Sequence, residues 1–482
     1  MLLSELFPGD PASRGAVEVS GLTADSRAVR PGYLFAALRG GAADGADFIG
    51  DAPRRGAVAV LADRHAPPCA VPLITDPDPR HRLALVAARF FGAQPRFIAA
   101  VTGTSGKTSV AEFTRQIWLA TGRKAATLGT LGVVGGAASQ SLALTTPDPV
   151  TLHRALAEIA AGGVDHVAME ASSHGLDQRR LDGVEVSAAA FTNLSQDHFD
   201  YHAGPEDYLA AKLRLFGTVL APGGAAVLNA DAPEFERLAA QCRARGHAIV
   251  TYGEAPSDLR LVEAAAGGQG QTLSIDAGGQ RHRIEFPLPG VFQALNALCA
   301  VGLAMASGVS LGRALHAMAG LTGVRGRLET VATLANGARV FVDYAHKPGA
   351  LEAVLTALRP HVSGRLVVVF GCGGDRDQGK RILMGRIAAA LADAVIVTDD
   401  NPRREDPAFI RGQALAGCPD AEEIGDRGAA INAAVAGLRA GDGLVIAGKG
   451  HEAGQTVGDE IIPFDDAEVA RRAVASLERR TS

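Results

Sequence analysis

Short apolar runs alternate with helix-length segments along most of the chain, and polar or glycine-rich residues follow nearly every run. Residues 97–101 form one such run, which a loop of small residues follows before a segment of helical periodicity begins at Lys107. Buried parallel strands read as continuous apolar runs, and the helices that connect them cover both faces of the sheet. The pattern therefore predicts an α/β fold built mainly on parallel sheets.

Breaks in this pattern divide the chain into three units. We expect a small N-terminal α/β domain over 1–93, a central parallel-sheet domain over 94–326 and a C-terminal Rossmann-like domain over 327–482. A helix is predicted from residue 77 to 91. The predicted strands of the two larger units cover residues 142–147, 164–169, 188–191, 225–228, 339–342, 366–370, 394–398 and 444–447.

Composition narrows the class of protein. A chain of 482 residues is too long for one ordinary core, and 47% hydrophobic with 21% charged residues is typical of a globular protein. The net charge of −5 provides no basic field for nucleic acid. Five scattered cysteines without a C-x-x-C pair argue against a zinc site or a disulfide framework. With no signal peptide and no membrane-length apolar segment, we expect a cytoplasmic monomer.

The loop after residues 97–101 has the arrangement of a phosphate site. Loop N–H groups and the helix N-terminus attract an anion, Lys107 would reach the terminal phosphates, and Thr108 would offer a hydroxyl to Mg²⁺. Val101 stands where the general P-loop has its first glycine, so this loop is shorter. That short form is typical of amide-forming ligases of the Mur and folylpolyglutamate synthetase type. The candidate ATP-binding residues here are Gly103, Thr104, Ser105, Gly106, Lys107, Thr108 and Ser109.

Polar clusters follow the predicted strands, where ligands of parallel sheets bind. Glu170 ends a buried strand, and a carboxylate there suits Mg²⁺, which prefers oxygen ligands. His198 lies in a dense patch of Asp and His residues. Lys212 lies on an amphipathic helix predicted over 206–216, and periodicity alone assigns it only the usual solvated position.

Strand ends of the last unit are rich in basic residues. Arg381, Arg403 and their neighbours concentrate positive charge on one rim of the predicted sheet. Because guanidinium groups bind carboxylates in a bidentate way, an anionic small molecule is the expected partner.

Twelve motifs spread over nearly the whole chain match, in the same order, those of one known enzyme family. They are DSR with PGYLFAAL, GTSGKT, LGTLG, TTP, EASSHGLDQRR, FTNLSQDHFDYH, NAD, GVRGRLE, VDYAHKPGALE, GCGGDRDQGKR, DNPR and GKGHE. The chain resembles the Mur ligases of peptidoglycan synthesis, specifically those that add meso-2,6-diaminopimelate to UDP-N-acetylmuramoyl-L-alanyl-D-glutamate. The resemblance implies three domains that bind the UDP-sugar, ATP and the amino acid, with Mg²⁺ as cofactor and an acyl-phosphate intermediate.

The resemblance also implies residue roles. The UDP-sugar dipeptide would contact Ser26, Thr145, Thr146, Ser172, Gln178 and Arg180. The residues that would hold Mg²⁺ are Thr108, Glu170, His198 and Lys212, with Lys212 in its carbamylated form. The residues on which catalysis would depend are Lys107, Glu170, His198 and Lys212. ATP would also contact Asn296, Arg327 and Asp343. The DNPR motif marks diaminopimelate as the amino acid, held by Arg381, Asp400, Asn401, Pro402, Arg403, Gly448 and Glu452.

Some residues depart from the family pattern, and alternatives stay open. Gly349 replaces a usual aspartate after Y-A-H, while Gln293 and Ser105 replace usual asparagines. A lysine-adding ligase or a folylpolyglutamate synthetase-like ligase shares most of these features. A nucleotide-dependent switch would hydrolyse ATP without forming an amide, and a catalytically inactive scaffold would lack the central lysines and acids. Asp25 and Arg27 alone also fit a turn with a surface ion pair.

Overall fold

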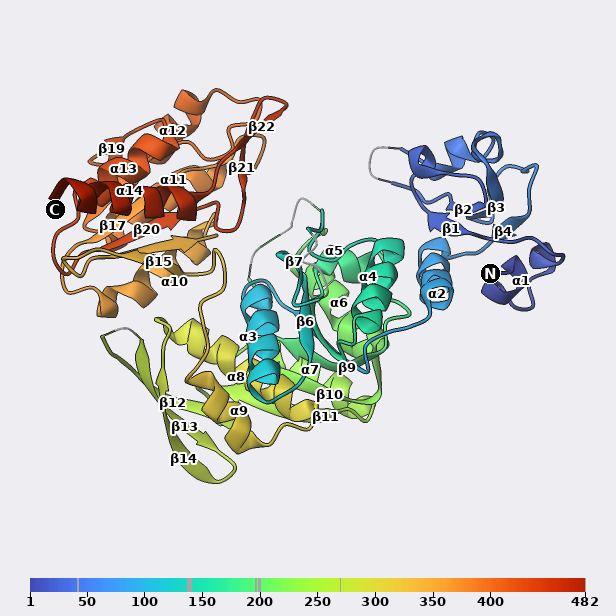
Figure 1. Ribbon diagram of the computed structural model, residues 1–482, viewed down its shortest axis with the longest axis horizontal. Coiled ribbons are helices and arrows are strands. Elements are labelled where there is room, and N and C mark those ends of the chain that lie inside the picture. The colour runs from blue at the N-terminus through green and yellow to red at the C-terminus, as the bar shows by residue number, and fades with distance from the viewer. Residues whose placement is uncertain (41–42, 137–140, 196, 198–200, 269, 482) are drawn as a thin grey trace. The chain divides into compact units, whose positions relative to one another are not determined.

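The computed structural model describes residues 1–40, 43–136, 141–195, 197, 201–268 and 270–481. By its internal contacts the chain divides into two compact units, one of Met1–Arg260 with Ala297–Ala317 and one of Leu261–Asn296 with Met318–Ser482. The described residues form three larger sheets and one small hairpin, and helices connect many of the parallel strands (Figure 1). The predicted α/β class is confirmed.

The N-terminal sheet contains four parallel strands in sequence order within the described chain. Its elements are α1 (Leu3–Leu6), β1 (Gly21–Thr23), β2 (Tyr33–Ala36), β3 (Ala57–Ala62), β4 (Leu73–Thr75) and α2 (Pro79–Phe91). The α2 helix begins at Pro79 because the Asp78 side chain accepts from the His81 N–H, and its C-cap is Gly92. The helix predicted over 77–91 is therefore confirmed with a start two residues later.

The central sheet has the strand order β14-β13-β12-β11-β10-β9-β5-β8-β6-β7 over the described residues. Its strands are β5 (Phe97–Thr102), β6 (Ala125–Gly129), β7 (Gly132–Val134), β8 (His166–Glu170), β9 (Val186–Phe191), β10 (Leu220–Asn229), β11 (Ala248–Gly253), β12 (Leu259–Ala266), β13 (Gln271–Ala277) and β14 (Gln280–Phe286). The helices that accompany them are α3 (Lys107–Ala120), α4 (Pro149–Ala161), α5 (Ser173–Asp177), α6 (Pro205–Arg214), α7 (Phe235–Ala244), α8 (Val291–Ala306) and α9 (Leu311–Met318).

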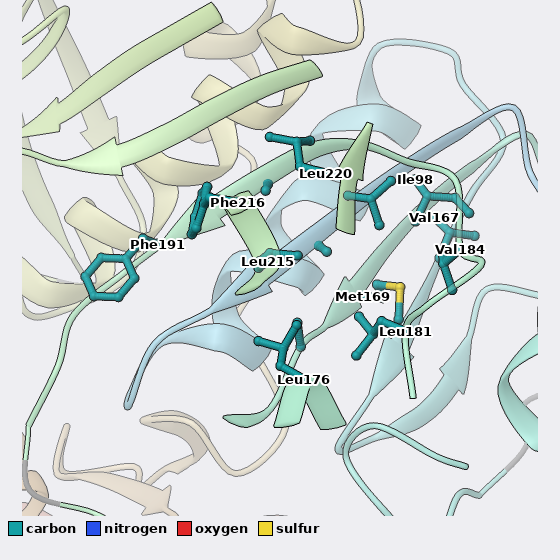
Figure 2. Packing of buried hydrophobic residues seen from close by; sticks show 14 of the residues in the cluster. Ile98, Val167, Met169, Leu176, Leu181, Val184, Phe191, Leu215, Phe216 and Leu220 are labelled. Atoms are coloured by element: carbon teal, nitrogen blue, oxygen red, sulfur yellow. The ribbon is translucent and has the colours of Figure 1, made fainter. Parts of the chain in front are cut away.

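Strand β5 lies between β8 and β9 and pairs in parallel with both. Every residue of β5 after Phe97 is buried, as a strand covered on both faces requires. Side chains from β5, β8 and β9 pack with Leu215 and Phe216 in one apolar cluster (Figure 2). This packing fixes the carboxyl end of β5, from which the glycine loop leaves.

One predicted strand is wrong. Residues 142–147 form bends and loop, and Leu144 is 48% exposed. The place beside β6 is taken by β7, which pairs with β6 in the antiparallel direction. The apolar residues of this segment therefore have no neighbouring strand, and the chain instead leads to Asp148, the N-cap of α4. The hairpin of β13 and β14 is also antiparallel, so the sheet is mixed.

The C-terminal sheet has the order β15-β16-β20-β17-β18-β19, antiparallel only at β15 among its described pairs. Its strands are β15 (Glu329–Thr333), β16 (Arg339–Asp343), β17 (Leu366–Phe370), β18 (Ala394–Val397), β19 (Glu422–Glu423) and β20 (Gly443–Ala447), and a separate hairpin joins β21 (Gly454–Val457) to β22 (Glu460–Pro463). The helices are α10 (Pro348–Leu358), α11 (Gly379–Leu391), α12 (Pro407–Leu415), α13 (Arg427–Ala436) and α14 (Asp466–Thr481). None of the helices in the described chain is long and apolar enough to span a membrane.

A buried ion pair joins α13 to α14. The Arg427 Nε and Nη2 groups donate to the two Asp466 carboxylate oxygens, both at 2.7 Å, and both side chains are fully buried. Arg427 Nη2 also donates to the Ala447 carbonyl oxygen at the end of β20. A charge in this position depends on its partner because water cannot solvate it.

Asp466→Ala should lower the free energy of unfolding by about 3–5 kcal/mol, because it leaves the Arg427 charge buried and unpaired. Glu468→Ala on the same helix is the matched control, since the Arg472–Glu468 pair is exposed and its loss should cost less than about 1 kcal/mol. Urea denaturation of both variants measures the difference. Equal losses would show that the buried pair does not hold α14 in place.

Candidate active site

The loop between β5 and α3 approaches the segment after β9 so closely at Gly103 that no side chain fits there. Gly103 has φ +147°, and a Cβ there would overlap the Thr192 hydroxyl. The segment after β9 braces the loop: Thr104 N donates to Asn193 O at 2.9 Å, and Ser105 N donates to Asn193 Oδ1 at 3.0 Å. Thr192 Oγ1 donates to Ser105 O at 2.6 Å. These hydrogen bonds hold the loop at the N-terminus of α3, where backbone N–H groups and the helix dipole attract an anion.

Two lysine ammonium groups converge on this loop. Lys107 Nζ donates to the Gly103 and Thr104 carbonyl oxygens at 3.0 and 2.8 Å, and Lys212 Nζ donates to the same Gly103 oxygen at 2.8 Å. Lys212 is 1% exposed and lies over the Tyr208 ring, 4.2 Å from its centroid. The solvated position that helical periodicity assigned to Lys212 is therefore wrong, because Lys212 lies on the buried face of α6, with Tyr208 one turn before it, and this face contacts the loop.

Glu170 joins the loop helix to the neighbouring strand. Thr108 Oγ1 donates to one carboxylate oxygen at 3.0 Å, and Thr130 N donates to the other at 2.7 Å. Mg²⁺ binds through one or two carboxylates together with phosphate oxygens and waters, so a buried carboxylate beside a hydroxyl fits it. The described residues contain no group of three or more His, Cys, Asp or Glu side chains that would hold a metal without such a partner. His198 lies outside the described residues.

The residues proposed for the sugar–peptide form one polar network next to Glu170. Thr146 Oγ1 donates to Glu170 O at 2.8 Å and accepts from Ser172 N at 3.0 Å. Arg180 donates to Thr146 O and to Gln178 Oε1, both at 2.7 Å. Thr145 Oγ1 lies 3.0 Å from Thr130 Oγ1.

Tyr201 extends this network and was not predicted as a site residue. Its hydroxyl donates to Asp177 Oδ2 at 2.5 Å and accepts from Gln178 Nε2 at 3.1 Å, while its ring contacts the His174 ring. A side chain that is 41% exposed gives no burial pattern to detect.

Ser26 belongs to the N-terminal sheet region. It begins a short 3-10 turn after β1 and is partly exposed. Asp25 and Arg27 beside it form an exposed bidentate ion pair, so the surface-pair interpretation holds for those two residues. No described contact links Ser26 with the glycine loop.

A second polar group lies in the unit that contains the C-terminal sheet. Asp343 ends β16, and its carboxylate accepts from Leu328 N at 2.6 Å and from Ala345 N at 2.7 Å. Burial raises the pKa of Asp343 to about 6. The Arg327 guanidinium lies over the Tyr344 ring, and Gln293 Nε2 donates to Arg327 O at 3.1 Å.

Asn296 completes this group. Its Nδ2 donates to Gln293 Oε1 at 3.4 Å. One connected cluster therefore contains the three residues of this unit that were proposed to contact ATP: Asn296, Arg327 and Asp343. Gln293 keeps the hydrogen bonds of an amide in that cluster despite its departure from the family pattern.

The residues after β18 and β20 form a third cluster around a buried ammonium group. Lys449 Nζ is fully buried, donates to Asn401 Oδ1 at 3.0 Å and to Glu452 Oε2 at 3.3 Å, and lies 3.5 Å from Asp400. Because an ammonium group only donates, the Asn401 atom that faces it is the oxygen. The Asn401 amide nitrogen therefore donates to Glu452, at 3.0 Å. Gly448 has φ +120° and lies against the Asp400 carboxylate.

Arg403 is held in an uncommon backbone conformation beside this cluster. Its φ is +52°, a left-handed conformation that is unfavourable for any residue with a Cβ. Arg403 N donates to Thr456 O, and Gly458 N donates to Arg403 O, so β21 pairs with the Arg403 backbone. The side chain donates to Gly374 O at 2.8 Å. A strained residue at a polar strand end is typical of a binding site.

Arg381, unlike the partly exposed Arg403, is fully buried. It donates to both Glu405 carboxylate oxygens at 2.9 Å, to Gln413 Oε1 at 2.6 Å and to Gly373 O at 3.1 Å. Neither Glu405 nor Gln413 was predicted. They lie 24 and 32 residues from Arg381 in the chain, so no local pattern indicates the contact.

Family models match all three parts of the chain. The Mur ligase family, catalytic domain model matches residues 18–91, the Mur ligase middle domain model 101–304, and the Mur ligase, glutamate ligase domain model 326–450. The chain is 54% identical to the UDP-N-acetylmuramoyl-L-alanyl-D-glutamate–2,6-diaminopimelate ligase of Bradyrhizobium diazoefficiens over 99% of both chains. The enzyme of the same name from Brucella melitensis biotype 1 is 53% identical over 99% of this chain and 98% of the relative.

The chain belongs to the Mur ligase family. A solved diaminopimelate ligase of this family superimposes with a TM-score of 0.73 at 32% identity over 99% of each chain. A MurF ligase from Thermotoga maritima in complex with ADP shares the fold at 16% identity, with a TM-score of 0.63. The resemblance read from the motifs is thereby confirmed, together with the three-domain α/β fold.

Lys107→Ala should lower ligase turnover at least about 100-fold, because it removes the charge that faces the phosphates. Isothermal titration with ATP and an assay of phosphate release measure the loss, and circular dichroism checks the fold. Lys124→Ala is the matched control, since Lys124 is exposed before β6. Turnover near the control value would exclude a phosphate role for Lys107.

Proposed function

We propose that the protein is the ATP-dependent ligase that adds meso-2,6-diaminopimelate to UDP-N-acetylmuramoyl-L-alanyl-D-glutamate in peptidoglycan precursor synthesis. The observation that carries this function is identity of 50–54% along almost the whole chain to relatives of that name. The retained DNPR and GKGHE residues support it, since they form one connected cluster. The products are the amide-linked tripeptide precursor, ADP and phosphate.

Each domain would hold one substrate. We assign residues 1–93 to the UDP-sugar end, 94–326 to ATP and 327–482 to the amino acid. The enzyme would work as a cytoplasmic monomer. Ser26 would contact the UDP-sugar, while the Thr146–Arg180 network would hold the dipeptide next to the glycine loop.

Activation of the D-glutamyl carboxylate requires phosphate transfer from ATP, because oxide is a poor leaving group. Lys107 and the loop N–H groups would neutralise and align the terminal phosphates. Thr108 and Glu170, with carbamylated Lys212 and His198, would hold Mg²⁺, which supplies positive charge to the phosphate oxygens when bound. Asn296, Arg327 and Asp343 would contact ATP from their own cluster. The diaminopimelate amine then attacks the acyl phosphate, and phosphate leaves.

Recognition of the distal amino-acid end requires both signs of charge. Glu452 supplies a carboxylate for the ammonium group, and Arg403 supplies a guanidinium for the carboxylate. Lysine lacks that carboxylate and would leave the guanidinium unpaired, which gives strong discrimination. Asp400, Asn401, Pro402 and Gly448 complete the proposed diaminopimelate site, and Arg381 belongs to it through its ion pair with Glu405.

Mass spectrometry of the product tests the proposal. The enzyme is incubated with UDP-N-acetylmuramoyl-dipeptide, ATP, Mg²⁺ and a panel of diamino acids. We expect one amide-linked product with meso-diaminopimelate and little or none with L-lysine or L-glutamate. ATP hydrolysis without any amide product would indicate a nucleotide switch, and preference for lysine would indicate the lysine-adding ligase.

Arg403→Ala should raise the KM for diaminopimelate about 10- to 100-fold, because one charged hydrogen-bonded contact is lost. The KM for ATP should stay within about twofold. Arg404→Ala is the control: Arg404 is the next residue, and its guanidinium pairs with exposed Asp459. Steady-state kinetics, with the concentration of each substrate varied in turn, distinguishes a change in the KM for diaminopimelate from a change in the KM for ATP. A change confined to the KM for ATP would contradict the assignment of the amino-acid site.

A further inference from the structure

All four terminal N–H groups of Arg381 have partners within the protein. Glu405 accepts two of them, Gln413 accepts the third and Gly373 O accepts the fourth. A guanidinium group has five N–H donors, and the remaining one, on Nε, is buried without a partner. Arg381 therefore has no terminal donor left for a substrate carboxylate while Glu405 is in place.

Glu405 also connects two loops at the carboxyl edge of the sheet. Its Oε1 accepts from Asp375 N at 2.5 Å, and its own N–H donates to Pro402 O at 3.1 Å. The side chain thus ties the Gly373–Asp375 segment to the loop after β18, which contains Pro402. The Arg381 guanidinium keeps the pKa of Glu405 below its usual range, so the carboxylate stays ionised.

These two loops form the support of Arg403. Arg403 Nη1 donates to Gly374 O, and Gly374 N donates to Asn401 O at 2.9 Å. A Cβ at Gly374 would overlap Pro402 O, so the loops are in direct backbone contact. The uncommon φ of Arg403 persists only where the surroundings enforce it.

We propose that Glu405 is a positioning residue for recognition of the distal carboxylate of the diamino acid. Glu405 forms an ion pair with the Arg381 guanidinium, and this pair holds in place the loop after β18 that contains Arg403. Arg403 is then the binding arginine, and Arg381 acts through Glu405. This inference rests on the proposed function, because it concerns the same amino-acid site.

Glu405→Gln tests the proposal in the full-length enzyme. Glutamine keeps an acceptor for Asp375 N but loses the charge that holds Arg381. We expect the KM for meso-diaminopimelate to rise at least tenfold, with the KM for ATP and for the UDP-sugar dipeptide within twofold. The ratio of kcat/KM for diaminopimelate to that for L-lysine should fall in parallel, which a general loss of stability would not produce.

The sign of the KM change separates two roles of Arg381. If Arg381 binds the distal carboxylate itself, Glu405 competes with the substrate, and Glu405→Gln would lower the KM for diaminopimelate. A lowered or unchanged KM, or an equal rise for all three substrates, would overturn the proposal. Failure of the wild-type enzyme to use diaminopimelate would instead refute the proposed function.

Two further variants complete the experiment. Gln413→Leu removes only one neutral acceptor of Arg381, and we expect a rise in the KM for diaminopimelate of about threefold. If Glu405→Gln does not fold, Gln413→Leu still tests the proposal, because an unchanged KM of Gln413→Leu for diaminopimelate would overturn it. Asp459→Asn is the matched control, since it removes an exposed carboxylate from neighbouring Arg404 and should leave every KM unchanged.

Discussion

A single buried carboxylate holds the central site together. Glu170 accepts from the Thr108 hydroxyl on α3 and from Thr130 N after β6, while its own carbonyl oxygen accepts from Thr146. These contacts connect the phosphate loop, the neighbouring strand and the sugar–peptide network at one point. A buried carboxylate is stable only when such donors satisfy it. The arrangement of three separate segments thus depends on the position at which β8 ends.

Buried cations repeat this principle in the C-terminal sheet. Arg381, Arg427 and Lys449 are fully buried, and each contacts loops at the carboxyl edge of the strands. Such pairs add little net stability compared with apolar packing, but removal of one partner is costly. They specify loop geometry, which is what recognition of a small zwitterion requires. Lys212 has a similar position under the phosphate loop.

The sequence predicted the regular parts of this structure well because buried parallel strands leave a plain apolar signal. The position of Glu170 at a strand end followed from that signal, and so did the glycine loop. The strand over 142–147 was wrong because a run of apolar residues does not reveal that β7 already occupies the sheet edge. The burial of Lys212 was missed because its partner, Gly103 O, lies 109 residues away.

The C-terminal site shows the same limit. The DNPR motif indicated Asn401 and Arg403 as site residues. The pairing of Arg381 with Glu405 could not be predicted in this way, because it depends on how two loops pack against each other. The left-handed backbone of Arg403 is likewise imposed by β21 and not by local preference.

The residue after Asn401 has a consequence for the chemical durability of the enzyme. Asparagine ages by deamidation when the backbone nitrogen of the next residue attacks the side-chain amide, and Pro402 has no N–H with which to do so. Conversion to aspartate would place a second negative charge against Glu452 and remove the donor that now faces it. The proline therefore protects an amide whose loss would turn an ordered contact with Glu452 into repulsion.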